Sequence, residues 1–575
     1  MPSHWGNRDL HIVTQSSPTG SQCLPAVGCA EATRYLQDRK LGLEVFRDAV
    51  TYVFIGEGAP SEGEFWESLN TACRLALPIV YLVADNGYAI SVPSKDQAPG
   101  PISELVSGFP GLLVRRFDGC DYLASRGIGA EAIARVRSGE GPALLHATVT
   151  LPYSHSSSDN QAKYRDAAEL EKERERDPLV AFEAGLVSEG ILSADAAEKI
   201  KADAHETAAR AGAAALAGAR PDPKTVSEHL LALPIIPDPP PGSESGTDFV
   251  HFGEAIRRTF HEVMAKDERV RVFGEDVADA PEELLPSLQG IGGVFGTTHG
   301  LQRIFGTDRC YNTPLAEANI VGRGGRPGLA RAQAHPRGAV FRLHLAGDAT
   351  DPFGDGDDAL ALGGDVRPSD GPAGRNRRLR NRRSDLALAV RRVDLHPHPR
   401  TNRHVPEQGA RLCRHAPSSL LCDDPVLFLE HKALIRQRYA MDPFPSKEFV
   451  IPLGKAANVR EGDDLTIVTW GATVHRSQVA AERLAEEGIE IEILDLRTLS
   501  PWDRESVIAS VTKTSRVLVV HEDVLTGVSG LRSPPSSPTP ASRSSTRRRA
   551  ESARLTPGWV TSRRSRRPHC PKSTR

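Results

Sequence analysis

The fold of this protein is decided by residues 49–88, which read AVTYVFIGEGAPSEGEFWESLNTACRLALPIVYLVADNGY. Ala49–Ile55 and Ile79–Val83 are short apolar runs rich in β-branched and aromatic residues, which is typical of strands buried on both faces of a parallel sheet. The stretch between them has the length of one crossover helix. The pattern therefore predicts a strand–helix–strand unit of an α/β domain.

Polar residues stand at the end of each predicted strand. Glu57 follows the first strand and Asn86 follows the second. The carboxyl ends of parallel strands meet at one edge of a sheet, where α/β proteins bind their ligands. Ser61 and Glu64 fit a capping box that opens the crossover helix, which we expect to end near Leu77.

This edge has the chemistry of a magnesium and diphosphate site. A carboxylate, an amide oxygen and backbone carbonyls are ligands that Mg²⁺ prefers, and phosphate oxygens can complete the octahedron. The helix that follows Gly58 offers unpaired N–H groups to a diphosphate. The alternative interpretation is that Glu57 is a turn residue and that Asn86-Gly87 forms an ordinary β-turn.

Composition excludes several classes of protein. The 575 residues carry a net charge of −3, so no overall charge favours nucleic acid or an anionic membrane. No apolar run approaches the ~18 residues of a membrane-spanning helix, and the N-terminus lacks a signal peptide. Eight cysteines in a chain of this length do not indicate a disulfide framework. We expect a cytoplasmic protein that binds neither membrane nor nucleic acid.

Three stretches of the first third resemble one enzyme family. They are MPSHWGNRDLHIVTQSSPTGSQCLPAVGCA, the segment GEGAPSEGEFWESLN…LPIVYLVADNGYAIS, and LPYSHSSSDNQAKYR. They resemble the decarboxylating alpha subunits of thiamine-diphosphate-dependent 2-oxo acid dehydrogenases. The resemblance departs from the family at Asp85, where Asn is more usual, and it implies that the chain begins inside the alpha subunit.

The resemblance implies a set of cofactor contacts. Mg²⁺ would be held by Glu57, Asn86 and the Tyr88 carbonyl. The diphosphate would lie along Gly56, Gly58 and Ala59. Ser17 and Thr19 would line the cofactor, and His155 would reach its phosphate and the mouth of the active site. A K⁺ site of the branched-chain members would be formed by Ser16, Pro18, Ser21 and Gln22. Without the surrounding motif, His155 reads as an exposed loop histidine.

The rest of the chain resembles the beta subunit of the same enzymes. FVHFGEAIRRTFHEVMAKDERVRVFGEDVAD and NTPLAEANIVG carry the first part of this resemblance. In the family, the Glu at the position of Glu317 hydrogen-bonds the aminopyrimidine of thiamine and favours the tautomer that removes the thiazolium proton. A half-buried carboxyl there would hold its proton more tightly. The alternative is a helix-opening Glu favoured by the macrodipole.

The resemblance implies transketolase-like parallel-sheet domains with three α/β/α layers, followed by a C-terminal α/β domain used in dimer assembly. We expect an alpha-like diphosphate domain over 1–231, a linker over 232–247, a beta-like pyrimidine domain over 248–440 and the C-terminal domain over 441–575.

Two segments look like shifted reading frames. Residues 323–420 contain 18 Arg and no Lys, as expected of a GC-rich gene read out of frame. A shift of one nucleotide across 387–408 permits HSQSVESTFTHIPGRTAMFPSK, which resembles the histidine-bearing active-site stretch of the beta subunit. The opposite shift restores a helical pattern in 528–575. The acidic run 354–358 and the basic run 374–383 are therefore read as out-of-frame peptide, and the chain as it stands is expected to be inactive.

The sequence therefore predicts a fused alpha–beta decarboxylating component of branched-chain type, acting on 2-oxoisovalerate. Its expected cofactors are thiamine diphosphate, Mg²⁺ and K⁺. Its expected partner is the lipoyl group of a dihydrolipoyl acyltransferase core, and two copies would match an alpha2beta2 assembly. Gly56-Glu57-Gly58, in place of GDG, and the K⁺-like loop favour branched-chain substrates over pyruvate. The alternatives are a pyruvate or acetoin enzyme and, from another class, a basic nucleic-acid-binding fusion built on the Arg tracts.

Overall fold

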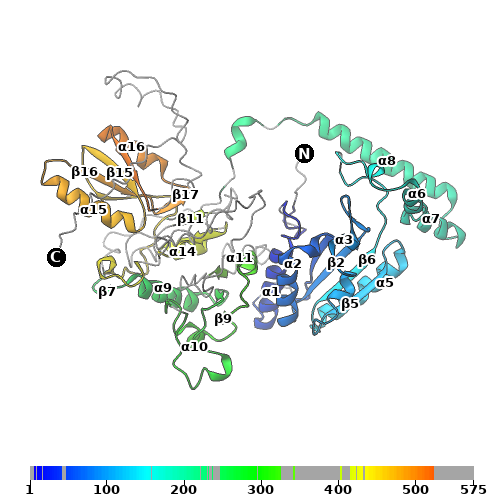
Figure 1. Cartoon of the computed structure of the whole chain (residues 1–575), viewed down its shortest axis with the longest axis horizontal. Helices are drawn as coiled ribbons and strands as arrows, with labels where there is room; N and C mark the ends of the chain where they lie inside the picture. The colour runs from blue at the N-terminus through cyan, green and yellow to red at the C-terminus, as the bar shows by residue number, and fades with distance from the viewer. Residues whose placement is uncertain are drawn as a thin grey trace, which may run out of the picture. The chain divides into compact units, whose positions relative to one another are not determined.

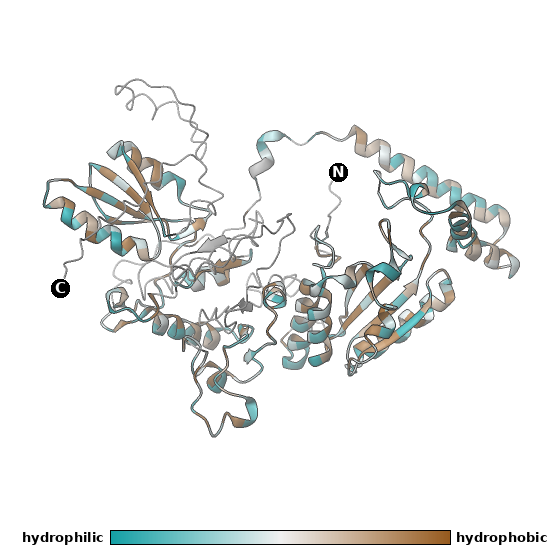
Figure 2. Cartoon of the chain, in the orientation of Figure 1, coloured by the Kyte–Doolittle hydropathy of each residue, from teal (hydrophilic) through white to brown (hydrophobic). Residues whose placement is uncertain are grey.

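The computed structural model describes residues 6–7, 10–15, 17–41, 47–156, 158–220, 222–228, 231, 236, 246–293, 295–324, 341–343, 402–404, 415–422, 424–431 and 434–522 (Figure 1). Apolar residues gather on the strands of its larger sheets (Figure 2). None of the described helices is both long and apolar enough to span a membrane.

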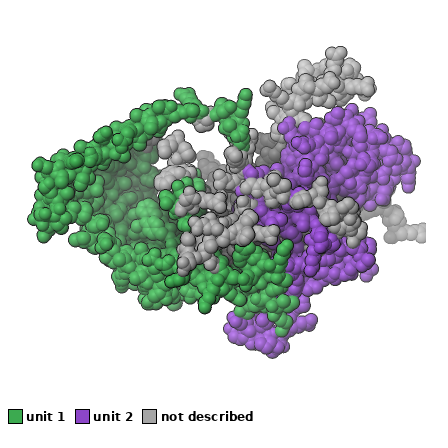
Figure 3. Space-filling model, turned by 180° about the vertical axis from the view of Figure 1, so that it is seen from behind, with its two compact units in different colours: residues 1–228, 264–278, 302–345 green, residues 229–263, 279–301, 346–575 purple. Residues whose placement is uncertain are grey.

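The chain forms two compact units (Figure 3). Unit 1 comprises Met1–Glu228, Met264–Ala278 and Gln302–Leu345, and unit 2 comprises His229–Val263, Asp279–Leu301 and Ala346–Arg575. Unit 1 thus joins the alpha-like sequence to two stretches of the beta-like sequence.

The main sheet of unit 1 is parallel throughout and confirms the predicted α/β fold. Its strand order is β1-β2-β6-β5. The strands are β1 (Thr51–Gly56), β2 (Ile79–Asp85), β6 (Ala143–Thr148) and β5 (Leu113–Asp118). The two strands predicted from sequence are β1 and β2, and they pair in register from Thr51 and Ile79 to Gly56 and Ala84.

The helix between β1 and β2 begins later than the sequence predicts, and the capping-box prediction is wrong. A 3₁₀ turn covers Ala59–Ser61, and α2 runs only over Gly63–Arg74 with Glu62 as its N-cap. The hydroxyl of Ser61 is 3.1 Å from the Gln97 side-chain oxygen and so does not cap the helix. The two residues of the supposed box therefore belong to different elements.

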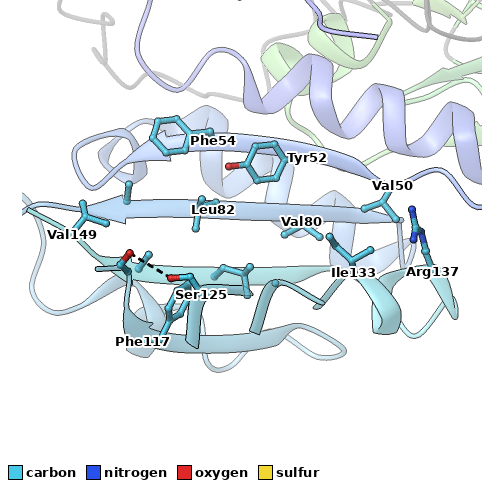
Figure 4. A pocket seen from close by; sticks show the side chains of 15 residues that line it. Val50, Tyr52, Phe54, Val80, Leu82, Phe117, Ser125, Ile133, Arg137 and Val149 are labelled. Atoms are coloured by element: carbon cyan, nitrogen blue, oxygen red, sulfur yellow. Dashed lines mark hydrogen bonds between the residues drawn. The ribbon is translucent and has the colours of Figure 1, made fainter. Parts of the chain in front are cut away.

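Helices cover the two faces of this sheet unequally. α1 (Cys23–Arg39) and α2 share the larger core cluster with one face, and α5 (Tyr122–Arg137) packs on the other. Beside α5 a groove of about 540 Å³ remains over β1, with Tyr52 and Phe54 on its wall (Figure 4). These two rings are 59% and 50% exposed.

Smaller elements complete the alpha-like part. A short hairpin is formed by β3 (Tyr88–Ala89) and β4 (Val92–Pro93). The other helices here are α3 (Ser94–Gln97), α4 (Ile102–Leu105), α6 (Ala167–Glu175), α7 (Pro178–Ser188) and α8 (Ala194–Ala217).

A second, three-stranded parallel sheet lies in unit 1, with the order β10-β8-β9. Its strands are β10 (Phe341–Leu343), β8 (Arg271–Gly274) and β9 (Cys310–Asn312), followed by α11 (Glu317–Gly324). α11 packs closely on α1, since a Cβ on Gly28 would lie 2.5 Å from the Arg323 carbonyl oxygen. β10 falls within 323–420, whereas most of that segment and all of 528–575 lie outside the described residues.

A buried ion-pair cluster fastens α1 to these beta-like elements. The Glu31 carboxylate, 3% exposed, accepts a 2.5 Å hydrogen bond from Arg323 and lies 3.3 Å from Arg271. It also accepts a hydrogen bond from the Tyr311 hydroxyl. Burial raises the pKa of Glu31, but the two guanidinium groups outweigh that effect and hold the pKa below its usual value.

Unit 2 holds the C-terminal sheet, of order β14-β16-β15-β18. Its strands are β14 (Ala457–Arg460), β16 (Ile491–Asp495), β15 (Leu465–Thr469) and β18 (Val517–Val520), and its helices are α15 (Ala472–Ala485) and α16 (Arg504–Thr514). β14 is antiparallel to β16, and the other pairs are parallel.

Most of α9 (Phe252–Lys266) also belongs to unit 2. The remaining short elements are α10 (Leu301–Phe305), β7 (Phe249–Val250), β13 (Asp442–Pro443), β11 (Asn402–His404), β12 (Val426–Phe428), β17 (Thr498–Ser500) and α14 (His415–Leu421).

Candidate functional site

The structure brings together the two polar residues that the sequence places at the ends of β1 and β2. The backbone N–H of Asn86 donates a 3.3 Å hydrogen bond to the Glu57 carboxylate. The Asn86 side-chain oxygen accepts a 3.1 Å hydrogen bond from the Tyr88 N–H, which makes a compact turn. All three residues are partly buried. The proximity expected from parallel-strand geometry is confirmed.

The electrostatics of this edge favour a cation. Burial raises the pKa of Glu57, and the nearby Asp85 carboxylate adds to the rise, while backbone N–H groups and His155 oppose it. A divalent ion would relieve the repulsion between the two carboxylates. The described residues contain no cluster of three or more His, Cys, Asp or Glu suited to a metal. Three oxygens, from Glu57, Asn86 and the Tyr88 carbonyl, would leave places in a magnesium octahedron for phosphate and water. This donor set fits magnesium held together with a diphosphate.

The glycine loop allows a close approach to this edge. A Cβ on Gly58 would lie 2.8 Å from the Ala89 side chain, so a larger residue would displace the hairpin. Gly56 has nothing within 4 Å of its would-be Cβ, and the backbone there is open. Ala59 is buried and starts the 3₁₀ turn. The N–H groups nearest the loop therefore belong to this turn, and α2 begins further along the chain than expected.

The loop that carries His155 is fixed at its base. His155 is exposed, and its backbone N–H donates to Asp159, which also accepts a 2.8 Å hydrogen bond from the Tyr164 hydroxyl. The guanidinium of Arg165 lies 4.7 Å from the centre of the Tyr88 ring. Sequence reasoning did not assign Arg165 a role, although the Tyr-Arg pair ends the quoted loop.

The stretch predicted to line the cofactor and hold K⁺ precedes α1. Ser16 lies outside the described residues. The Ser21 hydroxyl donates 2.7 Å to the Pro18 carbonyl, and the Gln22 amide donates 3.2 Å to the Phe54 carbonyl on β1. Ser17 and Thr19 are exposed. The stretch is thus tied to β1, and its ion-binding role stays a prediction.

Glu317 differs from the expectation of a half-buried carboxyl, because its side chain is exposed. It is the first residue of α11, and the contacts of that helix come from later positions: Asn319 bonds Thr71 through its side chain at 2.7 Å and Glu67 through its N–H at 3.0 Å. Its place at a helix N-terminus agrees with the macrodipole alternative. The Glu317 charge contributes to a raised pKa at Glu67, which is caused first by burial.

A buried hydrogen-bonded chain behind the metal edge was missed by sequence reasoning. The Asp85 carboxylate is 2.9 Å from Nε2 of His146, and Nδ1 of His146 is 2.9 Å from the Ser103 hydroxyl. The other Asp85 oxygen accepts the Gly87 N–H at 2.9 Å. The His146 hydrogen bond is the main cause of a lowered pKa at Asp85. No local motif joins residues 85, 103 and 146, so sequence patterns could not predict these hydrogen bonds.

Three family models match separate stretches of the chain. Residues 2–224 match the "Dehydrogenase E1 component" family model, residues 250–341 the "Transketolase, pyrimidine binding domain" and residues 454–530 the "Transketolase, C-terminal domain".

Relatives with assigned names match along about half of the chain. The "Pyruvate dehydrogenase E1 component subunit beta" of Bacillus subtilis is 34% identical over 290 residues, covering 47% of this chain and 78% of the relative. The protein of the same name from Staphylococcus aureus is 34% identical over 279 residues, with the same coverage. The "2-oxoisovalerate dehydrogenase subunit beta 2, mitochondrial" of Arabidopsis thaliana is 34% identical over 292 residues, covering 50% of this chain and 75% of the relative.

Proposed function

Since this chain belongs to the thiamine-diphosphate-dependent 2-oxo acid dehydrogenase E1 family, we propose that its own residues form the magnesium and diphosphate half of the cofactor site at the ends of β1 and β2. The observation that carries this proposal is the contact between Glu57 and Asn86 at the carboxyl edge of a parallel sheet. The match of one polypeptide to both alpha-like and beta-like family models supports the proposal that each chain supplies both halves of the site.

The roles of the site residues follow from their chemistry. Glu57, Asn86 and the Tyr88 carbonyl would hold Mg²⁺, and the open backbone at Gly56 and Gly58 would accept the diphosphate. Thiamine diphosphate, when bound, supplies the electron sink that allows a 2-oxo acid to lose carbon dioxide. Glu317 would hold and move a proton at the pyrimidine of the cofactor.

His155 and the K⁺-like stretch complete the proposal at the mouth of the site. The exposed His155 side chain is near enough to Glu57 to lower the pKa of that carboxyl, which supports a role for His155 where an anionic diphosphate or substrate would enter. Ser17 and Thr19 would line the cofactor. A K⁺ ion would stiffen the stretch of Ser16, Pro18, Ser21 and Gln22 ahead of α1.

For the substrate we propose a branched-chain 2-oxo acid of the 2-oxoisovalerate type. The GEG loop and the K⁺-like stretch support it, as does the similarity to the Arabidopsis protein named for 2-oxoisovalerate. The pyruvate alternative is supported by the similarity, at the same 34% identity, to proteins named for pyruvate dehydrogenase. The acyl acceptor would be the lipoyl group of an acyltransferase core, and a homodimer would match the alpha2beta2 assembly.

The deciding experiment supplies 2-oxoisovalerate, pyruvate and acetoin in turn, with thiamine diphosphate, Mg²⁺ and a lipoylated acceptor domain. It measures acylation of the lipoyl group. Two proteins are compared: the chain as it stands, and a chain with 323–420 and 528–575 returned to frame. We expect turnover of 2-oxoisovalerate by the second protein only. Preference for pyruvate or acetoin would select an alternative substrate, and turnover by the unaltered chain would refute the frame hypothesis.

A further inference from the structure

The chain Ser103–His146–Asp85 invites comparison with a nucleophilic triad, but its burial excludes that use. His146 is 0% exposed and Ser103 is 7% exposed. Side chains alternate along a strand, and Leu145 and Ala147 of β6 line the groove of Figure 4. His146 therefore points to the opposite face, with Leu144 of the core beneath α1 and α2. A substrate cannot reach this serine. The role of these three hydrogen-bonded residues is therefore to position other parts of the protein.

One carboxylate oxygen of Asp85 is hydrogen-bonded to the turn that shapes the metal edge. This oxygen accepts from the Gly87 N–H and, at 3.3 Å, from the Ser94 hydroxyl. The Ser94 N–H in turn donates 2.9 Å to the Gly87 carbonyl. Gly87 has a φ of +83°, a conformation that favours glycine. Asp85 thus holds Gly87 and Ser94, the two ends of the hairpin that directly follows Asn86 and contains Tyr88.

The other oxygen of Asp85 is hydrogen-bonded to His146, and the donor and acceptor of that bond can be assigned. An ionised carboxylate can only accept, so Nε2 of His146 donates to Asp85 and Nδ1 accepts from the Ser103 hydroxyl. Every polar atom of the imidazole is then satisfied inside the core, and the charge of Asp85 is preserved.

We propose that Asp85, clamped by His146, is a positioning residue that fixes the metal-donor turn and places a second negative charge behind the bound Mg²⁺. This inference rests on the proposed function, because it assumes that the metal sits at Glu57 and Asn86. It explains why Asp can stand where the resembling family more usually has Asn: the buried imidazole supplies the donor that a carboxylate requires. Outer-sphere partners of this kind orient metal ligands and tune their affinity.

The test titrates Mg²⁺ by calorimetry into the full chain held with excess thiamine diphosphate, with thermal unfolding measured in parallel. Asp85→Asn keeps an acceptor for Gly87 but removes the charge, so Mg²⁺ should bind about tenfold more weakly at an unchanged unfolding temperature. His146→Gln retains an N–H donor for Asp85 and should bind Mg²⁺ as the parent does. His146→Leu removes that donor, and binding should weaken about tenfold.

Glu57→Gln separates failure of this inference from failure of the proposed function. If Glu57→Gln binds Mg²⁺ as tightly as the parent, or the parent binds none, the metal is not at this edge and the proposed function fails. If Glu57→Gln loses binding while Asp85→Asn does not, the role of Asp85 is wrong. An Asp85→Asn loss that only tracks a fall in unfolding temperature, or failure of His146→Gln to rescue, would likewise overturn it.

Discussion

Two α/β sheets of this protein each carry an aspartate at the carboxyl end of a parallel strand, and the two carboxylates differ in almost every other respect. Asp85 ends β2 and receives hydrogen bonds from His146, Gly87 and Ser94, which hold its pKa below the usual value. Asp495 ends β16 and is 0% exposed. One of its oxygens accepts the Arg497 N–H at 3.0 Å.

The second oxygen of Asp495 has no hydrogen-bond partner among the described residues, and burial raises the pKa of this carboxyl to about 8. The two carboxylates differ in their hydrogen bonding because the strands beside them differ. His146 on β6 pairs in register with Val83 and reaches Asp85, whereas Asp495 pairs with Thr469 on β15. The Thr469 hydroxyl is already bonded to Val520 and Thr473. Equivalent positions in similar sheets therefore do not imply equivalent chemistry.

The largest expected effect tests whether catalysis belongs to unit 1. In the chain returned to frame, Glu317→Gln should bind the cofactor but lose about 10²–10⁴ in decarboxylation rate, because an amide cannot carry the pyrimidine proton. The control is Asp495→Asn, which changes the carboxylate at the end of β16 in unit 2. It should leave the decarboxylation rate unchanged. Hydrogen exchange at the thiazolium carbon measures the proton step directly, and normal exchange in Glu317→Gln would contradict the role.

The next prediction concerns the buried carboxylate that joins the alpha-like and beta-like parts of unit 1. Glu31→Gln leaves Arg323 and Arg271 without their counter-charge, so the free energy of unfolding should fall by about 3–5 kcal/mol. Denaturant unfolding followed by Trp fluorescence measures it. The control is Asp308→Asn, which breaks the exposed pair with Arg39 and should cost less than about 1 kcal/mol. Equal losses would show that burial does not matter here.

The same carboxylate predicts an acid limit for unit 1. The folded pKa of Glu31 lies below its unfolded value, so its stabilisation is complete above the unfolded pKa of about 4.5 and is lost as the pH falls through the folded value. Unfolding measured from pH 6 to pH 3 should therefore be steeper for the parent than for Glu31→Gln. Parallel curves would mean that the ion pair is not formed.

The smallest expected effect is a gain in stability, and it concerns Asp495 in the C-terminal sheet. The folded pKa of Asp495, about 8, lies above its unfolded value, so its stabilising contribution is present at low pH and is lost as the pH rises through about 8. Asp495→Asn should raise the unfolding temperature of this domain by a few degrees at pH 8, about 4 °C, and by less at pH 5. A variant that is less stable than the parent at pH 8 would show that the charged form has a partner.

Sequence patterns predicted the parts of unit 1 that depend on neighbours along the chain. Apolar runs located β1 and β2, and parallel-strand geometry placed Glu57 beside Asn86. Ser61 was misassigned because a capping motif does not reveal that a 3₁₀ turn and Gln97 compete for its hydroxyl. The Asp85–His146 pair was missed because its partners are 61 positions apart, and only the sheet register brings them together.

The measurement that tests the central claim most directly is the binding of thiamine diphosphate to the intact chain by calorimetry, with Mg²⁺ and with a chelator. We expect Mg²⁺-dependent binding that Glu57→Ala weakens by more than about 100-fold, since the carboxylate that meets Asn86 is then absent. Asp96→Ala, which removes an exposed carboxylate from the neighbouring α3, should bind as the parent does. Binding by Glu57→Ala at the parent's affinity, or binding indifferent to Mg²⁺, would contradict the assignment of this sheet edge as the cofactor site.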